Sequence, residues 1–354
     1  MTLETATGTT MRALVQRAYG PPDVLRQADL PVPAPGAGQV RVRVSASSVN
    51  ARDWHIMRGE PRLARLLDRK VFGRAGPKLA VRGTDVSGVV DAVGTGVSRW
   101  RVGDSVFGEA AAAWADYAIA GADAVTCMPD ELSFDQAAAM PLAGATALSC
   151  LEAGDVQAGD ALLINGASGG VGTFALQLAA ARGAQVTAVC SARNTGQARA
   201  LGAGAVVDYA SVDFCATTAR YDVVVDLVGN RPVSALRRLV RPGGALVLSG
   251  GGVPGTGRYV GPIGVLVRAQ LLARRPGPRI AVPQAQPTTE QLDQLVEQVR
   301  AGTLRPVIDR SFDMADGAEA VRYVESEHAS GKVVLVNAQP AHVDPTVRGG
   351  GGQA

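Results

Sequence analysis

The stretch Leu162-Leu163-Ile164-Asn165-Gly166-Ala167-Ser168-Gly169-Gly170-Val171-Gly172 decides the fold, because an apolar strand ends in a glycine turn that opens directly into a helix. Three of its glycines stand where a tight turn, a close approach of backbone to phosphate and close helix packing each require a residue without Cβ. The apolar run 173–182 then has helical spacing and ends at Gly183. The free N–H groups and positive dipole end of such a helix would face a dinucleotide pyrophosphate. The predicted cradle consists of Gly166, Ala167, Ser168, Gly169, Gly170, Val171 and Gly172.

The residues after the next predicted strand, Gln185–Cys190, indicate which nucleotide binds. NAD enzymes usually carry an Asp or Glu there to hold the adenosine ribose hydroxyls. This chain reads Ser191-Ala192-Arg193-Asn194 instead, and its hydroxyl, guanidinium and amide suit a 2'-phosphate. The sequence therefore favours NADP(H) over NAD(H), with Ser191, Arg193 and Asn194 as contacts. The alternative is that Arg193 is a solvated loop charge.

Short β-branched runs alternate with helical runs after the glycine turn, which is typical of a parallel sheet covered on both faces. The runs expected to be strands are 205–209, 222–228 and 245–249. A helix at 232–240 is expected to end before the turn Arg241-Pro242-Gly243-Gly244. We predict a doubly wound, Rossmann-like α/β domain over residues 135–281. Further cofactor candidates follow its strands, where open α/β sheets place ligands: Tyr209, Asn230, Ser249, Gly250 and Gly251.

The flanking segments have a different character. Residues 40–44 alternate apolar and polar side chains, and 83–106 reads as short valine strands cut by glycines at 88, 94, 96 and 103. The C-terminal part supplies a helix after a capping box from Thr288 to Gln291, another helix over about 315–329, and a strand at 333–336. We predict a discontinuous β-rich domain, 11–134 and 282–337, that leaves a cleft against the inserted nucleotide domain.

Composition narrows the class of protein and of partner. A net charge of +3 with dispersed arginines does not indicate a nucleic-acid surface. The longest apolar stretch, 260–273, is too short and too interrupted for a membrane span. The four cysteines form no Cys-x-x-Cys pair, so no zinc ribbon is expected. Residues 1–10 are expected to be a flexible leader, or an upstream start before Met11, and 338–354 a disordered tail; we expect a cytoplasmic protein.

With these features, the chain resembles the zinc-independent medium-chain dehydrogenase/reductases of the quinone oxidoreductase type, over nearly all of residues 11–337. The motifs that carry the resemblance, besides the glycine turn, are Ser48-Val49-Asn50-Ala51-Arg52-Asp53-Trp54-His55, Gly83-Thr84-Asp85-Val86-Ser87-Gly88, Val93-Gly94, Gly103-Asp104, Asp226–Asn230 and Ser330-Gly331-Lys332. The resemblance implies a GroES-like catalytic domain around the Rossmann-like domain. It also implies a homodimer with NADPH bound in the cleft.

The resemblance also bears on zinc. In zinc-dependent relatives the ligands include a cysteine near the Asn50 position and a His-Glu pair where Thr84-Asp85 stands here, and this chain has neither. We therefore expect no zinc. Without a Lewis acid, simple alcohols are poor substrates, whereas quinones and enones accept hydride readily. The predicted reaction is NADPH-dependent hydride transfer to a quinone or an α,β-unsaturated carbonyl.

Four residues are the catalytic candidates, and a structural alternative is stated for three of them. Asn50 can donate to substrate or nicotinamide without titrating, or can serve only a turn. Asp53 is a candidate for relaying a proton, although a carboxylate that caps its own backbone is the alternative we favour. His55 can donate a proton near neutral pH, and Thr146 can contact the nicotinamide end or bond back to its own helix.

Three further expectations complete the sequence reading. Lys332 is placed near the cofactor by analogy, although a lone lysine at a strand start is usually solvated. The basic segment 58–78 allows an enoyl-thioester reductase as the alternative enzyme, unless it is a solvated helix. A non-catalytic NADPH-binding structural or regulatory protein is the remaining alternative, because a glycine cradle guarantees binding and not turnover.

Overall fold

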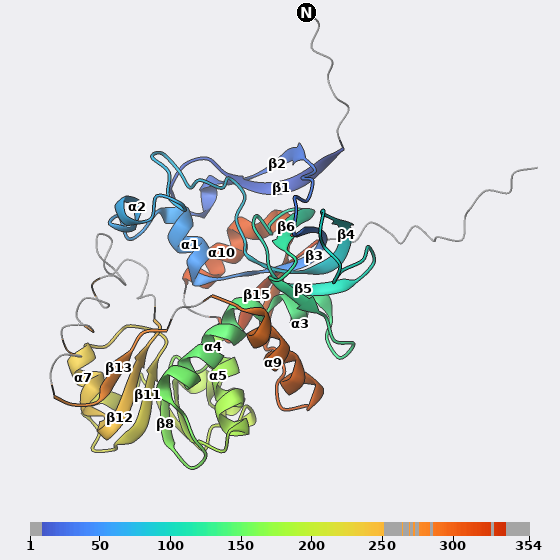
Figure 1. Cartoon of the computed structure of the whole chain (residues 1–354). Coiled ribbons are helices and arrows are strands. Elements are labelled where there is room, and N and C mark those ends of the chain that lie inside the picture. The colour runs from blue at the N-terminus through green and yellow to red at the C-terminus, as the bar shows by residue number, and fades with distance from the viewer. Residues whose placement is uncertain are drawn as a thin grey trace, which may run out of the picture.

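The computed structural model describes residues 9–250, 264, 269, 272, 276–283, 286–326 and 329–337. Figure 1 shows two parts, one built on the sheet labelled β8 to β13 and one built around β1 to β6 and β15. Strand β1 begins at Thr10, the last residue of the expected leader. The rest of that leader up to residue 8, the expected tail, Gly251 and most of the apolar stretch 260–273 lie outside the described residues.

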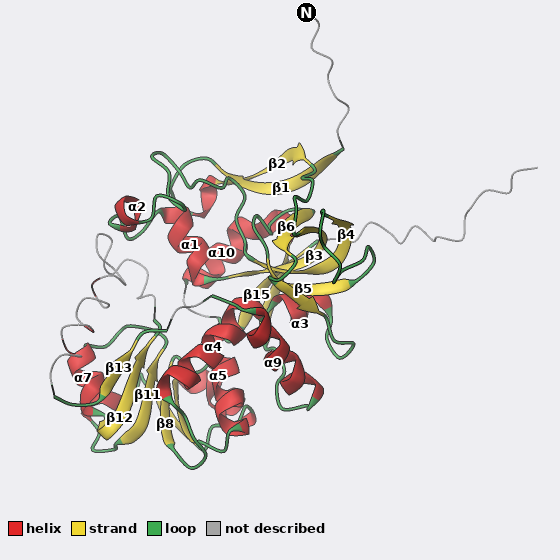
Figure 2. Ribbon diagram, in the orientation of Figure 1, coloured by secondary structure: helices red, strands yellow, loops and turns green. Residues whose placement is uncertain are grey.

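The first part is a six-stranded parallel sheet in the order β10-β9-β8-β11-β12-β13. Its strands are β8 (Ala161–Asn165), β9 (Gln185–Cys190), β10 (Ala205–Asp208), β11 (Tyr221–Asp226), β12 (Val240–Leu248) and β13 (Arg279–Ala281). Its helices are α4 (Pro141–Gly154), α5 (Gly170–Ala181), α6 (Thr195–Ala200) and α7 (Val233–Arg238), with 3-10 turns η2 (Ala192–Asn194) and η3 (Phe214–Ala216). Helices α4 and α5 cover one face and α7 the other (Figure 2), which confirms the doubly wound fold.

The second part is a mainly antiparallel sheet in the order β14-β15-β3-β4-β5-β7, with β6 beside β3 and a separate pair β1-β2. Its strands are β1 (Thr10–Gln16), β2 (Leu25–Pro31), β3 (Gln39–Val49), β4 (Asp85–Val93), β5 (Ser105–Glu109), β6 (Tyr117–Gly121), β7 (Val125–Cys127), β14 (Ile308–Asp313) and β15 (Lys332–Val336). Its helices are α1 (Ala51–Arg58), α2 (Ala64–Leu67), α3 (Phe134–Ala138), α9 (Thr289–Arg300) and α10 (Gly317–Glu325), with 3-10 turns η1 (Pro22–Val24) and η4 (Met314–Asp316). The GroES-like β-rich part is thus confirmed.

Three local expectations were wrong in detail. Helix α5 begins at Gly170 rather than after the glycine run, because Gly169 serves as its N-cap. Gly88 does not cut a strand: β4 runs through it, and a Cβ there would lie 2.1 Å from the carbonyl oxygen of Arg43 on β3. The expected turn at 241–244 lies within β12, where the register against β11 shifts.

Two further details concern the C-terminal part. The capping box is confirmed, since Thr288 accepts from the backbone N–H of Gln291 and α9 follows. The helix expected over 315–329 is shorter, α10 being preceded by η4 and ending at Glu325. Helix α9 packs on α4, where Leu295 contacts Gly144. The domain boundaries at 134/135 and 281/282 stay a prediction.

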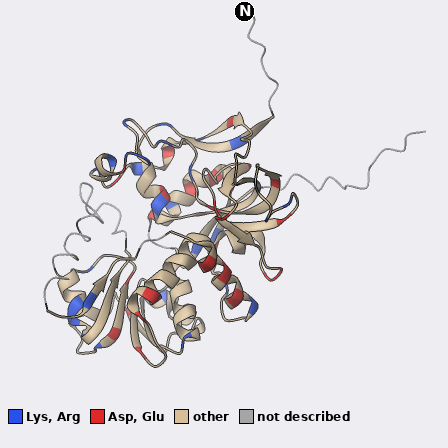
Figure 3. Cartoon of the chain, viewed as in Figure 1, with Lys and Arg blue, Asp and Glu red and all other residues tan. Residues whose placement is uncertain are grey.

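Charge and membrane features agree with the sequence reading. Figure 3 shows acidic and basic residues interspersed over both parts of the chain. In the part of the chain that the structure describes, no helix combines the length and apolarity needed to cross a membrane.

Candidate active site

A cleft of about 420 Å³ lies between the two parts, at the carboxyl ends of β8, β9 and β11. This is where open α/β sheets bind ligands, because the strand order reverses between β8 and β11. On the nucleotide side the predicted residues that line it are Gly166, Ser168, Gly169, Gly170, Val171, Gly172, Tyr209 and Asn230. On the other side the predicted residues are Asn50 and Lys332, with Ala51, Trp54 and Ala143 beside them.

The glycine turn has the geometry of a phosphate cradle. Gly166 has a φ of +85°, and a Cβ on Gly172 would lie 2.2 Å from the Gly166 carbonyl oxygen, so neither position accepts a side chain without strain. A Cβ on Gly169, in contrast, would meet only the Gly166 oxygen at 3.5 Å. The open side of Gly169 therefore faces the cleft beside the first N–H groups of α5, which have no partner within the helix. This arrangement fits a pyrophosphate.

Ala167 lies within the glycine turn, but it does not contribute to the surface of the cleft. Its side chain is fully buried in the core beneath the turn, and it does not line the cleft.

The predicted 2'-phosphate loop lies beyond Cys190, which lines the cleft at the end of β9. Arg193 is exposed. The pKa of Tyr323 on α10 is raised, chiefly by its hydrogen bond to Asp309, and the nearby charge of Arg193 opposes this in small part. Asn194 is buried and accepts a hydrogen bond from the Ser330 hydroxyl at 2.9 Å. Neither of these residues nor Ser191 lines the cleft as described, so their phosphate role stays a prediction.

Polar groups at the ends of β8 and β11 form part of the cleft wall on the side of the nucleotide domain. The Asn165 side chain donates to Asp226 at 2.8 Å and to Asn230 at 3.1 Å, which orients the Asn230 amide at the cleft. Ser249 and Gly250 follow β12 but do not line this cleft. Their backbone N–H groups donate to the Asp226 carbonyl oxygen, and the Ser249 side chain hydrogen-bonds Cys150 in the core.

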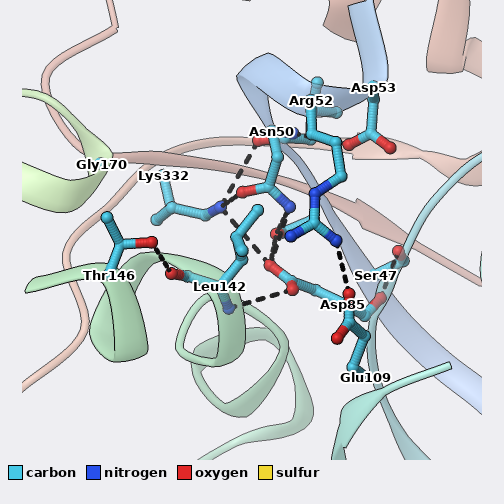
Figure 4. A network of polar contacts seen from close by, with 12 residues as sticks. Ser47, Asn50, Arg52, Asp53, Asp85, Glu109, Leu142, Thr146, Gly170 and Lys332 are labelled. Carbon is cyan, nitrogen blue, oxygen red and sulfur yellow. Dashed lines mark hydrogen bonds and ion pairs between the residues drawn. The ribbon is translucent and has the colours of Figure 1, made fainter. Parts of the chain in front are cut away.

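A buried polar network forms the opposite wall (Figure 4). The Asn50 amide nitrogen donates to Asp85 at 2.9 Å, and the Lys332 ammonium donates to the Asn50 amide oxygen at 2.5 Å. Asp85 also accepts from the Ser48 hydroxyl at 2.6 Å and from the backbone N–H of Leu142 at 3.1 Å. The nitrogen and the oxygen of the Asn50 amide are therefore both held by buried partners, which fixes the orientation of the amide. Asn50 thus does more than stabilise a turn.

Lys332 is only 3% exposed and lies 3.6 Å from Asp85, which corrects the expectation that a lysine at a strand start is solvated. Strand β15 pairs with β3 so that Val333 faces Val49, and the Lys332 ammonium bonds the amide of Asn50, the N-cap of α1. Burial lowers the pKa of Lys332, and the Asp85 and Asp53 carboxylates partly oppose that effect.

Asp53 adopts the alternative that the sequence reading favoured. Its carboxylate accepts the backbone N–H of Asn50 at 2.8 Å and so caps α1. Complete burial raises the pKa of Asp53 to about 6, although the Asn50 hydrogen bond lowers it. Asp53 does not line the cleft.

His55 and Thr146 also bond to groups outside the cleft. The His55 ring stacks on Trp54, with centroids 3.7 Å apart, and its Nδ1 lies 3.1 Å from the Glu60 carbonyl oxygen. The Thr146 hydroxyl donates to the Leu142 carbonyl oxygen of its own helix at 2.6 Å, which is the alternative stated for it. Neither residue lines the cleft.

The sequence reading missed Asp85 and Ser48 as parts of the site. Asp85 belongs to the motif Gly83–Gly88, but the sequence pointed to it only as a position where zinc-dependent relatives have a metal ligand. A signal for Lys332 was present: the chain has only three lysines, at 70, 78 and 332, among 35 Lys and Arg residues. A chain that otherwise uses arginine keeps the shorter, titratable cation at this position.

The donor set around this network does not suit zinc. Asp85 is the carboxylate that would face a metal, and its oxygens already accept from Ser48, Asn50 and Leu142 beside the Lys332 cation. Among the described residues no three His, Cys, Asp or Glu side chains are grouped so that they could hold a metal ion. The arrangement instead offers hydrogen-bond donors and one buried cation at the cleft.

Comparison with known proteins agrees with this geometry. Residues 36–175 match the family described as alcohol dehydrogenase GroES-like domain, and residues 201–335 match zinc-binding dehydrogenase. The chain is 31% identical to a chloroplast envelope quinone oxidoreductase homolog of Arabidopsis thaliana, over 93% of this chain and 99% of that protein. The structure resembles the quinone oxidoreductase from Coxiella burnetii, with a TM-score of 0.80, 30% identity, and coverage of 93% of this chain and 100% of that one. A mycobacterial protein solved as a complex with NADPH gives a TM-score of 0.78 at 26% identity, covering 92% of this chain and 99% of that one.

Proposed function

Since this chain belongs to the medium-chain dehydrogenase/reductase superfamily, in its quinone oxidoreductase-like branch, and is an oxidoreductase, we propose that it reduces a quinone or an α,β-unsaturated carbonyl with NADPH and without a metal. The observation that carries the proposal is the cleft, which joins the glycine cradle to the Asn50–Lys332 wall. Hydride transfer needs the two reactants side by side, and the cleft has room for both between these two walls.

The residues present suit NADP(H). Gly169 and the start of α5 would hold the pyrophosphate, Tyr209 would flank the adenosine half, and Asn230 would border the nicotinamide half. The exposed guanidinium of Arg193 would take the 2'-phosphate. NADPH, when bound, would supply the hydride.

The chain's own residues would then bind and polarise the substrate. Asn50 and Lys332 present their polar atoms at the wall opposite the cradle, while Trp54 and Ala143 supply apolar surface for a planar ring. We assign substrate contact to Asn50. Asp53, His55 and Thr146 we now place as supports of α1 and α4, because their polar atoms bond within or beside those helices.

Conjugated acceptors suit this wall better than alcohols or simple aldehydes. A quinone or enone delocalises the charge that hydride transfer creates, so a few fixed donors and a cation are enough to stabilise it. Zinc-like Lewis acid chemistry would require ligands that Thr84 and Asp85 do not offer together.

An enoyl-thioester reductase is the second candidate, based on the basic segment 58–78. Within that segment, Arg65 packs over the Tyr19 ring at 4.0 Å and donates to the Gly59 carbonyl, so it is structural. Arg69, Lys70, Arg74 and Lys78 are exposed and do not line the cleft. This weakens the case for a thioester relative to a quinone or enone.

The test is oxidation of NADPH and NADH by purified, chelator-treated protein against a benzoquinone, a naphthoquinone, an alkyl enone, an enoyl thioester and a simple aldehyde. We expect selective NADPH turnover with the quinones or the enone. Turnover of the aldehyde alone, lost with chelator and restored by zinc, would refute the metal-free reaction. Turnover of the thioester alone would establish the second candidate.

Two further properties are part of the proposal. By family analogy we propose a homodimer, which sedimentation or light scattering would test. We also propose a cytoplasmic location, for which fractionation of cells that express the chain is the test.

A further inference from the structure

Lys332 is the group in the cleft whose chemistry the hydride transfer itself leaves unused. It starts β15 directly after Gly331, and its stem passes so close to α5 that a Cβ on Gly170 would lie 2.9 Å from the Lys332 Cδ atom. Figure 4 shows its ammonium between Gly170 and Asn50, at the junction of the cofactor helix and the substrate wall. The stem of Lys332 therefore lies against the start of α5, and its ammonium lies against Asn50.

In the ion pair of Lys332 and Asp85, the lysine lies on the side of the cleft and the carboxylate lies on the side of the protein interior. Lys332 and Asn50 line the cleft, whereas Asp85 is fully buried behind them and does not. The ammonium has one short acceptor, the Asn50 oxygen at 2.5 Å, while the Val49 carbonyl oxygen and Asp85 lie at 3.5 and 3.6 Å. With long contacts to two of its three neighbours, the ammonium can turn an N–H toward a ligand in the cleft.

Asp85 does not depend on the lysine for its own hydrogen bonds. It accepts from Ser48, Asn50 and the Leu142 backbone, which together satisfy a buried carboxylate without a cation. A lysine needed only to neutralise Asp85 would be expected at a shorter distance. The geometry instead places the cation toward the cleft.

We propose that Lys332 is the general acid of the reduction, a role that rests on the proposed function. The substrate carbon gains the hydride, the π electrons move to the carbonyl oxygen, and one N–H proton of Lys332 passes to that oxygen. The product of an enone is an enol, which becomes the saturated ketone; the product of a quinone is a keto tautomer, which reaches the hydroquinone by moving a proton from the reduced carbon to the second oxygen. The neutral amine takes a proton from solvent. The overall reaction balances: substrate, NADPH and one proton give the reduced substrate and NADP⁺.

The electrostatic surroundings suit proton donation. The charged groups that face Lys332 are Asp85 on β4 and Asp53 on α1, and Asp85 is in turn coupled to Glu109. Glu109 pairs with Arg52 at 2.6 Å, and the buried Arg82 acts on Asp53. Desolvation is the largest effect on Lys332 and lowers its pKa, so its proton is released more readily than that of an exposed lysine.

The Lys332 cation should also affect the relative affinity for NADPH and NADP⁺, which can be measured without a substrate. The nicotinamide ring is neutral in NADPH and positive in NADP⁺, so a cation beside it favours the reduced form. Lys332→Met should therefore reduce the preference for NADPH over NADP⁺, by about thirtyfold for a ring about 8 Å from the ammonium at an effective interior dielectric near 20.

The experiment compares wild type with Lys332→Met, Lys332→Arg and Arg220→Met, which removes an exposed surface cation and serves as the control. Arginine keeps the charge but cannot give up its proton. We expect kcat to fall by about 10²- to 10⁴-fold in Lys332→Met and by at least about tenfold in Lys332→Arg, with NADPH affinity retained. The fall of wild-type kcat at high pH, and its solvent isotope effect, should be absent from both variants.

Persistence of the alkaline fall in kcat in Lys332→Met, or kcat within about twofold of wild type, would overturn the proposal. If the variant does not fold, lysine labelled with ¹³C at Cε gives three signals in wild type, since the chain has three lysines. The signal that shifts on NADPH binding should titrate below the ordinary lysine value of about 10.4. No such signal would overturn the proposal equally.

Failure of the proposed function would look different. Wild type would then turn over no quinone or enone, while the ratio of NADPH to NADP⁺ affinity could still be measured. A ratio reduced in Lys332→Met would keep the cation at the nicotinamide, and an unchanged ratio would remove Lys332 from the site.

Discussion

Replacing Gly169 with valine tests the cofactor cradle most directly. The position tolerates a side chain as far as the fold is concerned: a Cβ meets only the Gly166 carbonyl oxygen, at 3.5 Å, and the backbone there is extended, with φ of −76° and ψ of 177°. Valine at a helix N-cap in place of glycine costs about 1 kcal/mol. The protein should therefore fold, with a slightly lower melting temperature.

The effect on cofactor should be much larger. The valine methyl groups would occupy the cleft beside the first turn of α5, where the pyrophosphate would accept hydrogen bonds from backbone N–H groups. Loss of two such charge-assisted bonds, at about 1.5–3 kcal/mol each, weakens binding by about 10²- to 10⁴-fold. Wild-type NADPH affinity in Gly169→Val would refute the cradle.

The measurement is isothermal titration with NADPH, together with thermal unfolding to verify the fold. Gly196→Ala is the matched control, because a Cβ at Gly196 on α6 meets nothing within 4 Å and the position does not line the cleft. It should bind NADPH as wild type does. A Gly196→Ala variant as weak as Gly169→Val would mean that any change of glycine in this domain disturbs binding.

Three other predictions follow from the site. Arg193→Ala should weaken NADPH binding by about tenfold or more and NADH binding little, because only NADPH carries the 2'-phosphate. Equal losses of affinity in titrations with both cofactors would show that Arg193 does not bind the 2'-phosphate. Asp53→Asn tests the buried carboxyl: because its pKa is raised from 3.8 to about 6, its contribution to stability is present below pH 3.8 and is lost as pH rises through 6. Relative to wild type, Asp53→Asn should gain up to about 3 kcal/mol of unfolding free energy between about pH 4 and 7, measured by denaturant unfolding, and a constant difference would contradict this. Chelator should leave quinone turnover unchanged and added zinc should not raise it, since Thr84 and Asp85 stand where two metal ligands would be needed; a rise with zinc would reverse the metal-free assignment.

The strands of the nucleotide domain could be predicted closely because their signal is local. The strand at 185–190 is found at Gln185–Cys190, and the glycine turn lies at the switch point of the sheet. Each follows from a run of apolar residues or from a glycine that no other residue can replace within a few positions of sequence. The turn at 241–244 was misplaced because whether a Pro-Gly-Gly segment ends a strand or bulges within it depends on the partner strand, here β11.

The buried network of Asn50, Asp85 and Lys332 was predicted less well, because its members are distant in sequence. Lys332 and Asn50 are 282 positions apart and meet because β15 pairs with β3, a register that neither segment specifies alone. The sequence by itself determined the family, the parallel sheet and the glycine turn, all of which arise from short-range patterns. Only the tertiary structure decided that Lys332 is buried against Asp85 and that His55 and Thr146 bond away from the cleft, because burial and side-chain partners are properties of the packed chain.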